Sequence, residues 1–327
     1  MTHGAYETGL HAANWAITAG HQHVIIVGAG MAGLGAARQL LAHGVTTEIH
    51  EARERTGGRT TGIDVGGFTF DLGANWLQQY DDNLLARLAE QWELRVVPTD
   101  FGSEDCEGEL RERLAAAPEH ASVADVRDAW LHPAHRRPTS TGSSTRPSPS
   151  TPARHSTGSA PGTASNPASA TATAGLSAAT GYSSTAWRQG LPISLDTPVR
   201  DIRIDADGAV INEDVRADAV IVTVPLGPLR DITFTPALPE QHRTALTHLG
   251  AGRVEKIIMR LDRRFWTAPY FRIHGPASGS ISEWLDATEA DGTPTLVGLF
   301  AGPWLDDLWT GDDIAGRILS DVLRAGG

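Results

Sequence analysis

The sequence predicts an α/β fold, and three features near the N-terminus support this prediction. The segment Val24-Ile25-Ile26-Val27 is apolar and β-branched throughout, as expected of a buried parallel strand. A glycine-rich turn, Gly28-Ala29-Gly30-Met31-Ala32-Gly33, follows it directly. Apolar residues at helical spacing then predict a helix from Gly33 to His43, and residues 45–50 are typical of a second strand.

Each glycine of this turn has an expected role in binding a dinucleotide. Gly28 permits the tight turn, Gly30 lets the backbone approach a pyrophosphate, and Gly33 lets the helix pack closely on the sheet. The unpaired N–H groups at the helix N-terminus bind phosphate without a basic side chain. The candidate contacts in the turn are therefore Gly28, Gly30, Met31, Ala32 and Gly33.

Glu51 follows the second strand, where a carboxylate can accept hydrogen bonds from ribose hydroxyls. Glycine-rich turns alone are common connections between strands and helices. With the strand, the helix and Glu51 in register, an incidental loop is the weaker interpretation. NAD and FAD fit this unit equally well.

Two further motifs separate the cofactors, namely Gly57-Gly58-Arg59 and the stretch Asp71-Leu72-Gly73-Ala74-Asn75-Trp76. Together with the preceding pattern they resemble the flavin-containing amine oxidases, the family of monoamine oxidases, polyamine oxidases and flavin histone demethylases. The resemblance implies FAD as cofactor. Because Cys106 lies far from the place where some relatives attach FAD covalently, we expect a noncovalent cofactor.

The resemblance also implies further FAD contacts. Gly58 and Arg59 would hold the pyrophosphate, and Arg53 is an additional candidate, whereas Arg55 is expected to be a solvated surface residue. The stretch expected to run past the flavin is Gly73, Ala74, Asn75 and Trp76.

Two segments far downstream, residues 195–204 and 217–227, resemble the second passage of the family chain through the FAD domain. Within the first, Val199 matches the position whose backbone contacts the adenine. Residues 219–224 also have the composition of a buried strand. Residues 234–266 then resemble the entry to the substrate domain.

Lys256 is the one lysine among 27 basic residues. Arginine is always charged, whereas the pKa of lysine falls on burial, so a single lysine indicates a task that arginine cannot perform. Val254, Lys256 and Ile258 would share one face of a strand. Lys256 matches the family lysine that holds a water against the flavin, which makes it the candidate catalytic residue. A chance survivor on a strand edge is the alternative.

Composition excludes several classes of function. The net charge of −12 argues against nucleic acid as a partner, and the longest apolar runs are too short to span a membrane. Residues 1–22 lack the features of a signal peptide, so we expect a cytoplasmic protein. No histidine or cysteine spacing fits a metal site.

The segment 131–189 does not fit an intact family member. Residues 130–195 contain no Asp or Glu, and residues 138–186 are nearly all Ser, Thr, Pro, Ala, Gly and Arg. Such a segment buries too little apolar surface to offset its ordering entropy, so we expect disorder. Translation out of frame is the preferred explanation, with a flexible linker as the alternative. The family pattern returns abruptly at Gly190.

These observations predict a two-lobed, Rossmann-like FAD/NAD(P)-binding fold with a mixed α+β substrate domain. The expected parts are an extension (1–20), FAD-binding segments (21–80 and 190–232), and substrate-domain segments (81–130 and 233–327) around residues 131–189. The sequence stops before the last FAD segment of the family, so we expect a truncated and impaired chain.

The resemblance implies oxidation of a small mono- or polyamine by molecular oxygen, giving an imine or aldehyde and hydrogen peroxide. Two alternatives remain open. One is another FAD enzyme, such as a carotenoid desaturase or protoporphyrinogen oxidase, and the other is an inactive fragment.

Overall fold

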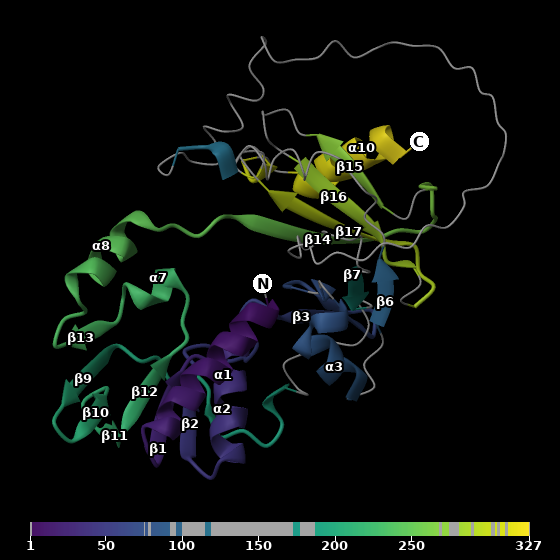
Figure 1. Cartoon of the computed structure of the whole chain (residues 1–327). Coiled ribbons are helices and arrows are strands. Elements are labelled where there is room, and N and C mark those ends of the chain that lie inside the picture. Colours follow the sequence, from purple (N-terminus) through teal and green to yellow (C-terminus); the bar gives the residue numbers. More distant parts are fainter. Residues whose placement is uncertain are drawn as a thin grey trace, which may run out of the picture. The chain divides into compact units, whose positions relative to one another are not determined.

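The computed structural model describes most of the chain outside residues 100–186. The described residues are 2–74, 76–77, 80–91, 96–99, 115–118, 173–176, 187–267, 270–274, 281–288, 291–301, 305, 308–310 and 313–326. By contacts, the chain divides into one unit of Met1–Asp100 with Thr171–Gly327 and a second of Phe101–Ala170. All helices and strands below belong to the first unit. Most of them are labelled in Figure 1.

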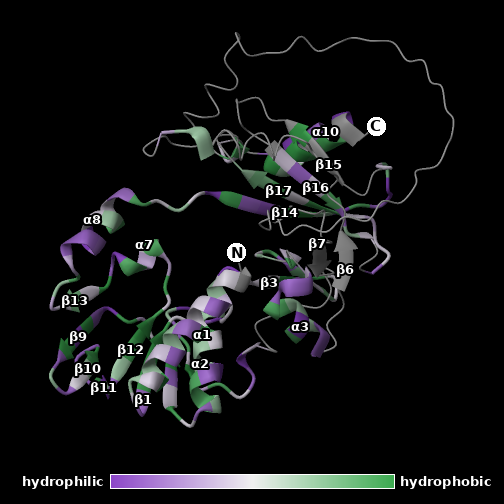
Figure 2. Ribbon diagram, in the orientation of Figure 1, coloured by the Kyte–Doolittle hydropathy of each residue, from purple (hydrophilic) through white to green (hydrophobic). Residues whose placement is uncertain are grey.

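A four-stranded parallel sheet carries the predicted dinucleotide-binding unit. Its strands, in the order in which they pair, are β12 (Ala219–Val222), β1 (His23–Val27), β2 (Thr46–His50) and β8 (Ile193–Ser194). The central strand β1 has no exposed surface at Val24, Ile25 and Ile26, because both faces of the sheet are covered. In Figure 2, β12 has the green of hydrophobic residues.

Two helices pack on one face of the parallel sheet. They are α1 (Thr2–Thr18) and α2 (Met31–Ala42), which lie side by side in Figure 1. The approach is close, since a Cβ built on Gly9 would lie 2.0 Å from the carbonyl oxygen of Ala32. The N-terminal segment, expected only as an extension, is therefore a helix packed in the core through Tyr6, Ala13 and Ala16.

The opposite face of the parallel sheet packs on a second sheet. Its strands are β11 (Val215–Ala217), β10 (Gly208–Ile211), β9 (Asp201–Asp205) and β13 (Thr233–Thr235). Ile25 and Val27 of β1 share a core with Ile202 and Ile211 of this sheet. Two short helices, α7 (Leu226–Leu229) and α8 (Glu240–His248), follow β12 and β13.

A hairpin of β3 (Gly62–Val65) and β4 (Phe68–Asp71) leads toward the second predicted motif. Gly66 and Gly67 join the strands with φ angles of 63° and 81°, as a two-residue turn of type I′ requires. The elements that follow are β5 (Trp76–Leu77), the 3₁₀ turn η1 (Tyr80–Asp82), α3 (Leu84–Gln91), β6 (Val96–Thr99) and β7 (Thr173–Leu176).

The expectation of disorder for residues 131–189 is wrong at two places. Strand β7 pairs antiparallel with β5 and β6. Trp187 has no exposed surface, and its ring packs edge-on against that of Tyr6 with 5.6 Å between the ring centroids. The backbone carbonyl of Trp187 accepts from Arg38 Nη2 at 2.9 Å. Apolar burial of this one large side chain orders the end of the segment. Residues 131–172 and 177–186 lie outside the described part of the chain.

An antiparallel sheet forms the C-terminal region. Its strands, in pairing order, are β14 (Val254–Arg260), β17 (Thr295–Ala301), β16 (Ile281–Asp286) and β15 (Tyr270–His274), and helix α10 (Ile314–Gly326) follows. Trp284 and Phe300 pack edge-on in its core with Ile318 and Val322 of α10. Among the described residues, no helix has the length and apolarity that a membrane crossing needs.

Candidate cofactor and catalytic site

The glycine turn after β1 has the geometry expected of a phosphate loop. Gly28 has a φ angle of 103°, and a Cβ on Gly33 would lie 1.9 Å from the carbonyl oxygen of Gly28, so both positions require glycine. At Gly30 the situation is different. Among the described residues, no heavy atom lies within 4 Å of a Cβ built there, so its backbone borders open space.

Gly30 is also the N-cap of α2, and no side chain of the described chain caps that helix. The first N–H groups of α2 therefore keep their capacity to bind an anion. An open backbone position at an uncapped helix N-terminus fits a pyrophosphate. Met31 and Ala32, predicted to lie in the glycine turn, form the start of α2, which begins two residues before the predicted helix start at Gly33.

Thr223 supports this turn and was missed by the sequence reasoning. Its hydroxyl donates to the carbonyls of Val27 at 2.8 Å and Gly28 at 3.0 Å. Thr223 comes directly after β12 and lies 196 residues from Val27 along the chain. A contact over this separation cannot be predicted from a single sequence.

Glu51 is 9% exposed and has a structural role beyond the predicted ribose contact. Its Oε2 accepts from the backbone amide of Ala29 at 2.8 Å, and its Oε1 accepts from the amide of Arg53 at 3.0 Å. The carboxylate therefore holds the glycine turn and the loop after β2 together. Each carboxylate oxygen retains a second lone pair that a ribose hydroxyl could use.

The Gly57-Gly58-Arg59 motif lies against the glycine turn. Gly57 forms a β-bridge with Gly30, and a Cβ on Gly58 would lie 3.4 Å from the Cα of Gly30. Arg59 and Arg53 are exposed beside this turn. The expectation that Arg55 is solvated is wrong, because Arg55 is half-buried and its Nη1 donates to the carbonyl of Gly58 at 3.1 Å.

The stretch predicted to pass the flavin is joined to the same motif. A Cβ on Gly73 would lie 1.9 Å from the carbonyl oxygen of Arg59, and that carbonyl accepts from the amide of Ala74 at 2.9 Å. Trp76 begins β5. Asn75 lies outside the described residues.

Val199 comes close to these elements through the segment that precedes it. The amide of Asp196 donates to the carbonyl of Arg53 at 3.1 Å, and the amide of Thr197 donates to that of Glu51 at 2.8 Å. Val199 itself is half-buried and packs against the core between the two sheets. The structure thus brings the two distant parts of the predicted site together.

Lys256 lies in the middle of β14 and faces the stretch after β4. Its Nζ donates to the carbonyls of Asp71, at 3.1 Å, and Gly73, and lies 5.4 Å from the centroid of the Trp76 ring. Burial lowers the pKa of Lys256 from 10.5 to about 8, and the nearby Asp71 carboxylate opposes that shift. Asp71 is 3% exposed and belongs to the site, although only the residues after it were singled out from the sequence.

These residues fit the two ends of one extended cofactor. The glycine turn, Glu51 and Val199 fit an adenosine diphosphate, and the Gly73–Trp76 stretch with Lys256 fits the opposite end. Within the described part of the chain, no cluster of His, Cys, Asp or Glu could hold a metal ion. The fold and the site define a dinucleotide-binding oxidoreductase with a half-buried lysine at the reactive end.

Comparison with known proteins identifies the family. The model of the flavin-containing amine oxidoreductase family matches residues 31–130 and 173–327. The match resumes at residue 173, ahead of Gly190, where the sequence pattern was expected to return. The chain therefore belongs to the flavin-containing amine oxidoreductases, and FAD is the cofactor that its site serves.

Individual relatives agree with this assignment. The chain is 27% identical to probable polyamine oxidase 4 of Arabidopsis thaliana, over 87% of this chain and 67% of that protein. It is also 27% identical to putrescine oxidase of Kocuria rosea, over 89% of this chain and 76% of that protein. A solved structure of wild-type putrescine oxidase bound to putrescine superposes with a TM-score of 0.59 at 20% identity, over 94% of this chain and 82% of the other, and supports the α/β fold.

Proposed function

We propose that this protein oxidises the C–N bond of a small aliphatic mono- or polyamine, with molecular oxygen as the electron acceptor. The products would be an imine, which water converts to an aldehyde, and hydrogen peroxide. FAD, when bound, supplies the redox chemistry by accepting a hydride from the carbon next to the amine nitrogen. The single observation that carries the proposal is that the half-buried Lys256 donates to the carbonyls of Asp71 and Gly73 in a chain of the amine oxidoreductase family.

The chain's own residues would divide the work between binding and proton handling. The α2 N-terminus and Gly30 would receive the pyrophosphate, and Glu51 would accept from the ribose. Arg59, which is exposed beside the turn, would add a charged donor for phosphate.

Lys256 would hold and move a proton. With a pKa of about 8, its Nζ changes charge close to neutral pH, whereas an ordinary lysine stays protonated there. The carbonyls of Asp71 and Gly73 fix the position of the ammonium while it does so.

The names of the relatives support an amine substrate. One is a putrescine oxidase and another a probable polyamine oxidase, so aliphatic di- and polyamines are the first substrates to test. A desaturase or protoporphyrinogen oxidase activity is disfavoured by the family match and by Lys256. An inactive fragment would bind no FAD.

The purified chain, supplied with FAD, tests the proposal. We expect flavin absorbance that bleaches without oxygen when putrescine or spermine is added, and peroxide when air is admitted. Lys256→Met should retain FAD but slow bleaching, reoxidation or both, and Lys256→Arg should not restore the rates. Bound FAD that dithionite bleaches and no amine does would show that the substrate class is wrong.

A further inference from the structure

A second cation, Arg260, lies on the same face of β14 as Lys256. Residues two apart in a strand point the same way, so the two side chains, four residues apart, face the same neighbours. Arg260 Nη1 donates to the carbonyl of Val65 at 3.1 Å, and its Cζ lies 5.5 Å from the centroid of the Phe70 ring. Strand β14 therefore contacts the chain between Val65 and Trp76 at two points. At each point a cationic side chain, Lys256 or Arg260, donates to a backbone carbonyl and lies near an aromatic ring.

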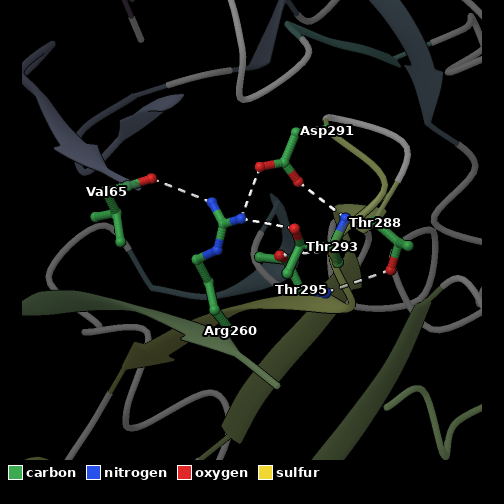
Figure 3. A network of polar contacts seen from close by, with 6 residues as sticks. All are labelled: Val65, Arg260, Thr288, Asp291, Thr293 and Thr295. Atoms are coloured by element: carbon green, nitrogen blue, oxygen red, sulfur yellow. Dashed lines mark hydrogen bonds and ion pairs between the residues drawn. The ribbon is translucent and has the colours of Figure 1, made fainter. Parts of the chain in front are cut away.

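The guanidinium of Arg260 is itself held in place from the other side. Its Nη2 donates to Asp291 Oδ2 at 2.6 Å and to Thr293 Oγ1 at 2.7 Å, both in the connection between β16 and β17 (Figure 3). The amide of Thr293 donates to Asp291 Oδ1 at 3.0 Å, which orients that carboxylate. The side chains of Arg260 and Asp291 are only 21% and 23% exposed. A planar guanidinium that bonds three partners through two of its nitrogens is held in one orientation.

The hairpin transmits this orientation to the seat of Lys256. A Cβ built on Gly66 would lie 3.7 Å from Arg260 Nη1, so the turn lies beside the guanidinium that bonds Val65. Strands β3 and β4 pair from Val65↔Phe68 to Gly62↔Asp71. When the turn and Phe70 are fixed on Arg260, the register of the hairpin fixes the carbonyl of Asp71.

We propose that Arg260 is a positioning residue that, through the β3–β4 hairpin, holds the carbonyls of Asp71 and Gly73 against the Lys256 ammonium. The inference rests on the proposed function only in so far as Lys256 serves amine oxidation. It assigns to the β16–β17 connection, with Asp291 and Thr293, a part in shaping the reactive end of the site.

Because Lys256 is the one lysine of the chain, its ionisation can be read directly. Protein labelled with ¹³C-lysine gives a single side-chain Cε signal whose shift is followed with pH in 0.15 M salt, without FAD or amine. The charged groups that face Lys256 are Asp71 on β4, Arg260, and Glu283, which lies two strands away on β16. For the parent chain we expect a midpoint near the pKa of about 8.

In Arg260→Gln, the released hairpin should let water reach Lys256, and the midpoint should move from about 8 toward 10.5. Loss of the arginine charge acts in the same direction, so Asp291→Asn separates the two causes. This variant removes a negative charge from the same network: a charge effect alone lowers the Lys256 midpoint, whereas release of the hairpin raises it. Arg264→Gln is the matched control. It removes an arginine that pairs with Asp286 at 2.8 Å, and its midpoint should stay with the parent.

A midpoint in Arg260→Gln that overlays the parent and the control overturns the proposal. If circular dichroism shows that Arg260→Gln does not fold, Asp291→Asn decides instead. Hydrogen exchange of the amides of residues 62–71 should then be faster than in the parent, and equal exchange rejects the proposal. Neither measurement uses FAD or an amine. The role of Arg260 can therefore be tested even if the protein does not oxidise amines.

Discussion

The backbone amide of Ala29 donates to Oε2 of Glu51 at 2.8 Å, in a buried hydrogen bond that joins the turn after β1 to the end of β2. A carboxylate that bonds a backbone N–H in a buried site forms one of the stronger hydrogen bonds in proteins. Glu51 therefore shapes the glycine turn before any ribose hydroxyl is present. The residue expected to recognise the cofactor therefore also builds part of the site.

Replacement of Glu51 should reduce both stability and FAD affinity. In Glu51→Gln one side-chain oxygen becomes an NH₂ group, so one of the two backbone amides loses its acceptor. We expect the free energy of unfolding of the FAD-free protein to fall by about 1–3 kcal/mol, and FAD affinity to fall by roughly 10- to 100-fold. Urea unfolding and isothermal titration measure the two effects. Glu54→Gln, at an exposed neighbour, should change neither.

Gly30 should be required by the cofactor and not by the fold. Its φ of −79° suits any residue, and no described atom would touch an added Cβ, so Gly30→Ala should unfold within about 0.5 kcal/mol of the parent. FAD binding should weaken by about 1–3 kcal/mol, because the methyl group occupies the approach to the pyrophosphate. Isothermal titration measures this loss.

Two other glycines provide controls for the Gly30→Ala variant. Gly227→Ala, also without described neighbours at the added Cβ, should leave FAD affinity unchanged. Gly33→Ala, whose Cβ would meet backbone at 1.9 Å, should destabilise the FAD-free protein itself. Unchanged FAD binding by Gly30→Ala would mean that the pyrophosphate lies elsewhere.

The parts of the site that could be predicted from the sequence are local ones. The strand, turn, helix and acid between Val24 and Glu51 follow one another in the chain, and each has its own pattern of residues. Lys256 could be singled out from the composition of the chain, because it is the single lysine. Chemistry that depends on a residue type or a short spacing is visible in one sequence.

The supports of the site depend on long-range contacts, which leave no such pattern. Thr223 bonds Val27 across 196 residues, and Arg260 bonds Val65 across 195. Trp187 lies in a segment whose composition indicated disorder. Burial of its single large ring orders the end of the segment, although the average composition favours disorder. Helix α1 contains two glycines and three threonines, which lower its helix propensity, so its packing on α2 contributes to its stability.

The lowered pKa of Lys256 should make stability depend on pH in a defined window. The folded protein releases the proton near pH 8 and the unfolded chain near 10.5, so between these values the unfolded state binds more protons. Stability contributed by this group therefore rises as pH increases from 8 to 10.5, and the burial cost is fully present below pH 8. The total change is up to about 3 kcal/mol.

Lys256→Met removes this titration and serves as the reference. Urea unfolding of the parent and of the variant at pH 7 and pH 9.5 cancels the contributions of all other groups. At pH 7 the free energy of unfolding of Lys256→Met should exceed that of the parent, and this difference should be smaller at pH 9.5. A constant difference between the two proteins would show that Lys256 titrates at its ordinary pKa.

Two glycines of α1 should respond in opposite directions to the same substitution. At Gly9 an added Cβ would lie 2.0 Å from the carbonyl oxygen of Ala32, so Gly9→Ala must push α1 away from α2 and should cost about 1–3 kcal/mol. At Gly4 no described atom lies within 4 Å of the added Cβ, so Gly4→Ala should gain up to about 1 kcal/mol from helix propensity. Thermal unfolding of the two variants measures both effects. Equal stabilisation by both alanines would mean that α1 does not pack closely on the helix that begins the cofactor site.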